Sequence, residues 1–133
     1  MKTVKSYCKN PAAERMVFLH PIVLMILAEV LQWCDEHGIS PLITETVTTL
    51  AEDEVLNRTS NTHRTARAFD LSTKGWSESL IDECVHFFSK RYFKYAAVNA
   101  KGENILVYHH DAGTGEHLHF QINSRFSIEN PMA

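Results

Sequence analysis

The chain has 133 residues, with 13 Lys and Arg against 16 Asp and Glu, and a formal net charge of -3 at pH 7. This length suits one domain, residues 1–133, and an apolar content of 44% is enough for a hydrophobic core without disulfides. The basic residues form no run or stripe, which argues against a nucleic-acid partner. The three cysteines, Cys8, Cys34 and Cys84, are widely spaced without a C-x-x-C pair, so we interpret them as free thiols.

The first strong pattern is the apolar run "PIVLMILAEVLQWC" at 21–34. Pro21 suits the first turn of a helix, and Gly38 suits the position just after its end. The run is too short to span a bilayer and contains Glu29 and Gln32, so we expect a buried core helix and no membrane association. The N-terminus shows no signal-peptide pattern. We therefore expect synthesis in the cytoplasm, with release by another factor if the substrate lies outside.

The rest of the chain alternates between strand patterns and one further helix. A run rich in Thr, Ile and Val at 41–50 indicates a strand, and the polar run at 51–62 indicates a short helical turn and a loop. Ser77 is typical of an N-cap for a helix over 78–92. Further strands are expected at 67–72, 95–100, 104–110 and 116–124, with tight turns at 101–103 and 111–115. This order predicts an α+β fold with an antiparallel sheet and flanking helices.

Histidines are concentrated near the C-terminus, where four of the eight fall between His109 and His119. His117 and His119 are two residues apart, so they point to the same face of a regular strand. Glu116 would face away from His119 in such a strand, but it follows "GTG", where an irregular backbone would aim it differently. Strand periodicity therefore places His117 and His119 on one face and does not decide on which face Glu116 lies.

A second group of metal-binding side chains lies upstream in "NTHRTARAFD", which carries His63 and Asp70. Together with His119 and its neighbours, this segment supplies the donor types of a catalytic zinc site, which has three protein ligands and one open position. The competing interpretation is that these histidines are structural and bind no metal. We give that structural role to His20, His37 and His86. One of His109 and His110 should face the site if 104–110 pairs with the last strand.

These residues resemble the zinc peptidase family of D-alanyl-D-alanine carboxypeptidases and L-alanyl-D-glutamate endopeptidases. That family carries a motif S-x-H-x-x-G-x-A-x-D and a second motif, E-x-x-H or D-x-x-H. In "NTHRTARAFD", His63, Ala68 and Asp70 match, while Asn61 replaces the Ser and Ala66 replaces the Gly. In "EHLH", Glu116 and His119 match the second motif.

The resemblance implies a hedgehog/DD-peptidase-like fold that binds Zn²⁺ through His63, Asp70 and His119. It implies Glu116 as the general base, with His117 as the second choice for a catalytic role. The expected activity is hydrolysis of an amide bond in the stem or cross-link peptides of peptidoglycan, by a monomer resembling a phage or prophage endolysin. An L-alanyl-D-glutamate endopeptidase is favoured over a D,D-carboxypeptidase.

One departure from the family concerns an arginine that its members often carry in the upstream strand to hold substrate. The equivalent place here is Thr48, and Arg58, Arg64 or Arg67 would have to substitute. For Arg67 we favour the interpretation of a solvated strand residue. The missing arginine motivates an alternative function, a non-catalytic metal-binding protein of a virion or the cell wall on the same fold.

Overall fold

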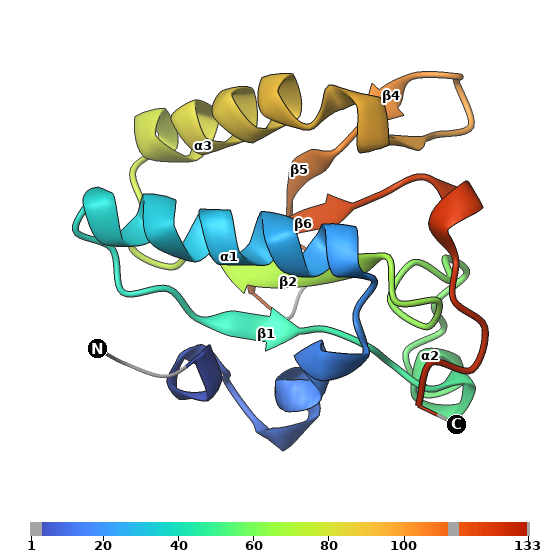
Figure 1. Ribbon diagram of the computed structural model, residues 1–133. Coiled ribbons are helices and arrows are strands. Elements are labelled where there is room, and N and C mark those ends of the chain that lie inside the picture. The colour runs from blue at the N-terminus through green and yellow to red at the C-terminus, as the bar shows by residue number, and fades with distance from the viewer. Residues whose placement is uncertain (1–3, 112–114, 133) are drawn as a thin grey trace.

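The computed structural model describes residues 4–111 and 115–132. Its main sheet is antiparallel, with the order β1-β2-β6-β5, and a two-stranded ladder lies beside it (Figure 1). The strands are β1 (Ile43–Glu45), β2 (Ala68–Ser72), β3 (Ala97–Val98), β4 (Asn104–Ile105), β5 (Val107–Asp111) and β6 (Glu116–Gln121). The helices are α1 (Pro21–Glu36), α2 (Leu50–Val55) and α3 (Glu78–Arg91), with short 3₁₀ segments at Val4–Tyr7, Pro11–Phe18, Phe93–Tyr95 and Ser124–Phe126. This architecture confirms the predicted α+β class.

The ends of α1 follow from local sequence. Pro21 opens the helix, and the ring nitrogen Nδ1 of His20 accepts a hydrogen bond from the Ile22 amide at 3.0 Å, which satisfies one of the free donors of the first turn. Gly38 ends the helix with φ 69°, the left-handed conformation that glycine adopts without a steric penalty. The structural role expected for His20 is therefore a cap.

Helix α3 begins as expected, because the Ser77 hydroxyl accepts from the Leu80 amide at 3.2 Å. Helix α2 is fixed by a capping box, in which Thr49 and Glu52 each accept a hydrogen bond from the other's backbone amide. Strand β1 is shorter than the predicted run at 41–50. The Thr46 hydroxyl donates to the Ala13 carbonyl at 3.0 Å, so the chain leaves the sheet there to pack on the Pro11–Phe18 segment.

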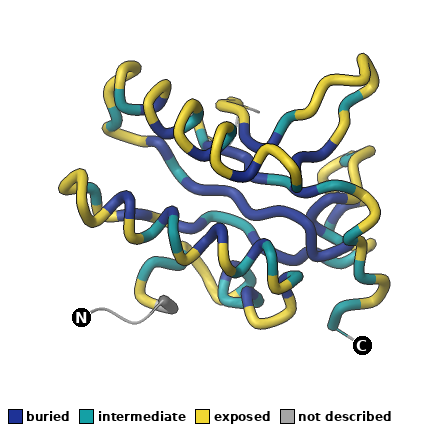
Figure 2. The backbone as a smooth tube through the Cα atoms, turned by 45° about the horizontal axis from the view of Figure 1, so that its top comes forward, coloured by how far each residue is buried: buried dark blue, intermediate teal, exposed yellow. Residues whose placement is uncertain are grey.

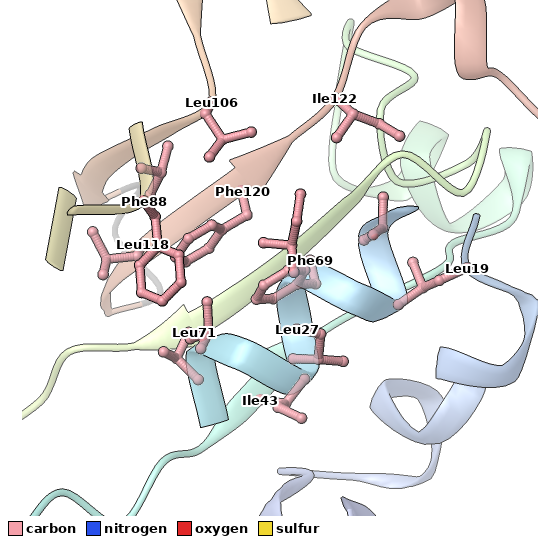
Figure 3. Packing of buried hydrophobic residues seen from close by; sticks show 14 of the residues in the cluster. Leu19, Leu27, Ile43, Phe69, Leu71, Phe88, Leu106, Leu118, Phe120 and Ile122 are labelled. Atoms are coloured by element: carbon pink, nitrogen blue, oxygen red, sulfur yellow. The ribbon is translucent and has the colours of Figure 1, made fainter. Parts of the chain in front are cut away.

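One face of the sheet is covered by α1 and α3 and holds the hydrophobic core (Figures 1 and 2). Phe69 of β2 and Phe120 of β6 stack with ring centroids 4.7 Å apart, and Phe88 of α3 meets Phe120 edge-on (Figure 3). Each side chain of this size stabilises the fold by about 1.5–3 kcal/mol when fully buried. The same face encloses Cys34 and Cys84 as buried free thiols, as expected.

Within the described ranges, no helix is long and apolar enough to cross a membrane. The predicted turn at 111–115 includes residues 112–114, which lie outside the described residues. The two strands it was expected to join, β5 and β6, do pair antiparallel, with Asp111 opposite Glu116.

Candidate metal centre

The opposite face of the sheet, which we call the open face, carries polar side chains from three neighbouring strands. The register places Asp70 of β2 opposite His119 of β6, and β5 places Tyr108 opposite His119 and His110 opposite His117. Side chains alternate along a strand, so Leu118 and Phe120 enter the core while His117 and His119 point the other way. The predicted common face of the two histidines is confirmed. Of the histidine pair on β5, it is His110 that lies beside His117, with ring centroids 5.5 Å apart.

His63 reaches this face from a tight turn before β2. The Arg67 amide donates to the Thr62 carbonyl at 2.9 Å, and the Ala66 amide donates to the His63 carbonyl at 3.1 Å. These two bonds form a Schellman motif with Ala66 at the left-handed position, where φ is 63°. Glycine usually occupies this position, and a residue with a Cβ pays about 1–2 kcal/mol for the conformation. In this chain Ala66 therefore stands where a glycine would be less strained.

Three side chains meet at the centre of the open face. His63 Nε2 lies 3.3 Å from Asp70 Oδ1, and His119 Nδ1 lies 2.8 Å from the same oxygen. One donor atom from each residue lies within 4.8 Å of the other two, and all three side chains are buried. The fold therefore brings together the three predicted zinc ligands, in an arrangement that could hold a metal ion.

The outer nitrogen of each ring is held by a hydrogen-bond acceptor. His63 Nδ1 donates to the Thr46 carbonyl at 2.7 Å. The Gln121 amide nitrogen donates to the Ile105 carbonyl at 3.2 Å, which orients Gln121 Oε1 to accept from His119 Nε2 at 3.1 Å. Metal-ligating histidines almost always have their second nitrogen fixed in this way. The inner nitrogens, His63 Nε2 and His119 Nδ1, are the ones that face Asp70. In a neutral ring the inner nitrogen has a lone pair that points at the carboxylate, and in a protonated ring it has an N–H.

The electrostatics of the group call for a cation between the rings and the carboxylate. Burial raises the pKa of Asp70, but His63 and His119 outweigh it and hold this pKa well below its usual range. Burial lowers the pKa of His63, but the charge and hydrogen bond of Asp70, together with Glu45 and the Thr46 carbonyl, outweigh burial and raise this pKa. For His119 burial prevails and the pKa is lowered. The negative charge of Asp70 can be balanced in two ways, by a proton on His63 or by a bound divalent ion.

The donor types and one of the donor separations suit zinc. Two ligands of a tetrahedral site with bonds of about 2.0–2.1 Å are separated by about 3.3–3.4 Å. The 3.3 Å between His63 Nε2 and Asp70 Oδ1 matches this edge, and the 2.8 Å between His119 Nδ1 and Asp70 Oδ1 is about 0.5 Å shorter. Two neutral imidazoles and one carboxylate leave a net charge of about +1 on bound Zn²⁺, which suits a Lewis acid.

The two predicted catalytic residues lie on opposite faces of β6. His117 Nε2 is 3.7 Å from Asp70 Oδ2, so this ring borders the three-residue group. Glu116 lies on the α3 side, where the Thr73 hydroxyl donates to Glu116 Oε1 at 3.3 Å and lies 2.9 Å from His109 Nε2. The structure therefore brings His117 to the group and does not bring Glu116 to it.

Glu45 and Arg58 border the group. Glu45 was not predicted as a site residue, whereas Arg58 is one of the three arginines considered in place of the family arginine. Arg58 binds both carboxylate oxygens of Glu45, at 2.6 and 3.0 Å, and Glu45 Oε2 lies 3.9 Å from His63 Nε2. This puts a guanidinium at the rim of the open face. Gln121 was also missed, although its spacing in H-x-H-x-Q puts it on the same strand face as the two histidines.

The other positions considered for the family arginine behave differently. Thr48 is buried and its hydroxyl donates to Asp53 at 2.7 Å, and Arg64 also reaches Asp53, at 3.4 Å. Arg67 is only 5% exposed, so its interpretation as a solvated strand residue was wrong. Its side chain turns inward because the turn before β2 places it beside the end of β6.

Comparison of the chain with protein-family models, curated proteins and solved structures found no match. The geometry of the open face therefore carries the functional argument.

Proposed function

We propose that this protein is a zinc-dependent hydrolase that cuts an amide bond in the peptide part of peptidoglycan. The observation that carries the proposal is the arrangement of His63 and His119, whose outer nitrogens are each held by an acceptor while their inner nitrogens face Asp70. The substrate class follows from the resemblance of the two motifs. An L-alanyl-D-glutamate endopeptidase in a phage or prophage endolysin, made in the cytoplasm and released to the wall, remains our preferred form of the proposal.

His63 Nε2, Asp70 Oδ1 and His119 Nδ1 would hold the ion. A zinc ion held by three protein ligands polarises a carbonyl oxygen and lowers the pKa of a bound water to about 7. Thr46 and Gln121 keep both rings in the tautomer that leaves the inner nitrogens free to bind. Asp70 supplies negative charge, and its low pKa keeps it ionised in the working range of the site.

We assign proton transfer to His117. Its ring lies on the open face and borders Asp70, and it is half-buried rather than enclosed, so it can meet both substrate and solvent. A positioned histidine contributes about 10²–10⁴-fold to such a reaction as acid or base. Glu116 stays a prediction from the resemblance. For that role its carboxylate would have to leave Thr73 and cross to the other face of β6.

The test is digestion of purified peptidoglycan by zinc-loaded protein, followed by assay of new amino groups and mass spectrometry of the fragments. We expect a single cleaved bond type, with His117→Ala at least about 100-fold slower. His86→Ala, a change at an exposed histidine on α3, is the matched control and should keep full activity. If zinc-loaded wild type releases no amino groups from any peptidoglycan chemotype, the hydrolase proposal is wrong.

A second function, a non-catalytic metal-binding protein of a virion or the cell wall, is favoured by the position of Glu116 on the α3 side and by Thr48 in place of the arginine. Co-sedimentation with intact cell walls separates the two functions. A binder would sediment with walls without changing them, and both His117→Ala and Glu116→Ala would sediment equally well.

A further inference from the structure

Arg67 is a buried arginine that has no acidic partner among the residues that the structure describes. Its Nε donates to the Thr65 hydroxyl at 2.9 Å, Nη1 to the Ile122 carbonyl at 3.0 Å and Nη2 to Asn61 Oδ1 at 2.8 Å. Among residues 4–111 and 115–132, it forms no ion pair with any carboxylate. The other arginines near the site do: Arg58 pairs with Glu45 and Asp53, and Arg64 with Asp53.

This arrangement is costly unless something else meets the charge. Taking a cation out of water is unfavourable, and neutral acceptors recover only part of the lost hydration. Burial lowers the pKa of Arg67, and no carboxylate within the described ranges opposes the shift. A guanidinium has five N–H groups, of which the three neutral acceptors take three. Two N–H groups therefore remain for a further acceptor.

Arg67 lines a pocket of about 560 Å³, which we call the Arg67 pocket. The turn before β2, the β3–β4 ladder and the end of β6 form its walls, and the start of β2 and the end of β6 lie at the same end of the sheet (Figure 1). Its other polar groups are hydroxyls and amides, and the described part of the lining contains no Asp, Glu or Lys. The volume is in the usual range for a small-molecule site, about 300–1,000 Å³.

The Arg67 pocket adjoins the metal centre. Tyr108 and Gln121 line the pocket, and both contact His119, the former with ring centroids 5.0 Å apart and the latter through the 3.1 Å hydrogen bond. Thr62, also in the lining, directly precedes His63. Arg67 lies three residues before Asp70, which corresponds to roughly 10 Å along an extended chain. A ligand of two or three residues spans that distance.

We propose that the Arg67 pocket binds a carboxylate, and that it holds a free carboxylate of the peptide whose amide bond lies at the metal centre. A carboxylate matches the planar fork of a guanidinium and neutralises a charge that the fold leaves unpaired. The hydroxyls and amides of the lining supply further donors without repelling an anion. The inference rests on the proposed function for the identity of the peptide, but the carboxylate site itself rests on Arg67 and its pocket.

The test uses calorimetric titration of zinc-free protein with γ-D-glutamyl-L-lysine and with the same dipeptide amidated at both carboxyl groups. We expect the free acid to bind at least about tenfold more tightly, because hydrogen bonds to charged groups contribute more than neutral ones. Replacing Arg67 would leave two buried acceptors, the Thr65 hydroxyl and the Ile122 carbonyl, without a donor and endanger the fold. The informative variant is instead Asn61→Asp, which places a carboxylate 2.8 Å from Nη2 in a nearly isosteric side chain.

Asn61→Asp should abolish the preference for the free acid while leaving the zinc content unchanged and without lowering the melting temperature. Asn10→Asp, the same change at an exposed N-cap outside the pocket, should keep the preference. Equal affinity for acid and amide in wild type, or a preference that survives in Asn61→Asp, would overturn the inference. Either result alongside active peptidoglycan digestion would overturn the carboxylate site alone. If zinc-loaded wild type does not digest peptidoglycan but the protein still binds the free acid more tightly than the amide, the proposed function alone would be overturned.

Discussion

Both faces of β6 are buried at their centre, but they are stabilised in different ways. On the core face, Leu118 and Phe120 need only contacts, and the stacked ring of Phe69 and the residues of α3 provide them. On the open face, His119 is also buried, yet each of its nitrogens requires a specific partner. The core face is complete within the chain, whereas the open face directs two histidines at a carboxylate and needs a cation to complete it.

This difference separates what specifies the fold from what specifies the activity. Changes on the core face should act on the free energy of unfolding whether or not metal is present. Changes on the open face should act mainly on the part of the stability that metal adds, because the removed groups bind the ion.

The largest expected effect is on the core face. Phe120→Ala should lower the free energy of unfolding by about 3–5 kcal/mol, because it removes a buried ring and leaves a cavity between Phe69 and Phe88. Urea denaturation with and without zinc should give the same loss. A loss that disappears on adding zinc would mean that the two faces are not separable.

The next effect is on the open face. At a free zinc concentration about 100 times its dissociation constant, zinc should stabilise wild type by about 2.7 kcal/mol. His119→Gln should abolish this increment, and a chelator should remove it from wild type. The exposed control His86→Gln should keep it. Differential scanning calorimetry with matched zinc additions measures the effect, and an unchanged increment in His119→Gln would contradict the assignment.

The zinc increment should also depend on pH. Burial lowers the pKa of His63, but Asp70, Glu45 and Thr46 together raise it more, so in the metal-free protein the ion pair with Asp70 stabilises the fold below the unfolded-state pKa. This contribution is lost as pH rises through the folded-state pKa. Zinc displaces that proton, so the zinc-induced rise in melting temperature should be larger at about pH 8 than at about pH 6. The opposite trend would show that zinc binds elsewhere.

The smallest effect concerns the turn that presents His63. Ala68→Gly should cost about 1 kcal/mol, because it removes a buried methyl group and frees the unfolded chain. Ala66→Gly makes the same chemical change but relieves the left-handed conformation at φ 63°, so it should stay within about 0.5 kcal/mol of wild type. Equal losses in thermal or urea denaturation would show that the turn stores no strain at Ala66.

Much of the fold could be predicted from local signals. Pro21, Gly38 and Ser77 mark helix ends through short-range backbone chemistry, and the spacing of His117 and His119 fixes their common face. The length of β1 could not be predicted, because a hydrogen bond from Thr46 to Ala13, 33 residues away, ends it.

The candidate site, like the fold, could be predicted where local sequence determines it and not where contacts between distant residues do. His63, Asp70 and His119 were found through residue type and motif, but their partners Thr46 and Glu45 depend on tertiary packing. The burial of Arg67 could not be predicted either, since its acceptor Ile122 lies 55 residues along the chain. For Glu116, strand alternation and the motif gave opposite indications, and the regular pairing of β5 with β6 follows the alternation.

The most direct test of the central claim is the metal content of untagged protein, measured by elemental analysis on wild type, His63→Ala and the control His86→Ala. The account predicts about one zinc per chain in wild type and in His86→Ala, and little in His63→Ala, because a catalytic-type site loses affinity with one of its three ligands. No metal in wild type after zinc is added and the excess removed, or full occupancy in His63→Ala, would contradict it.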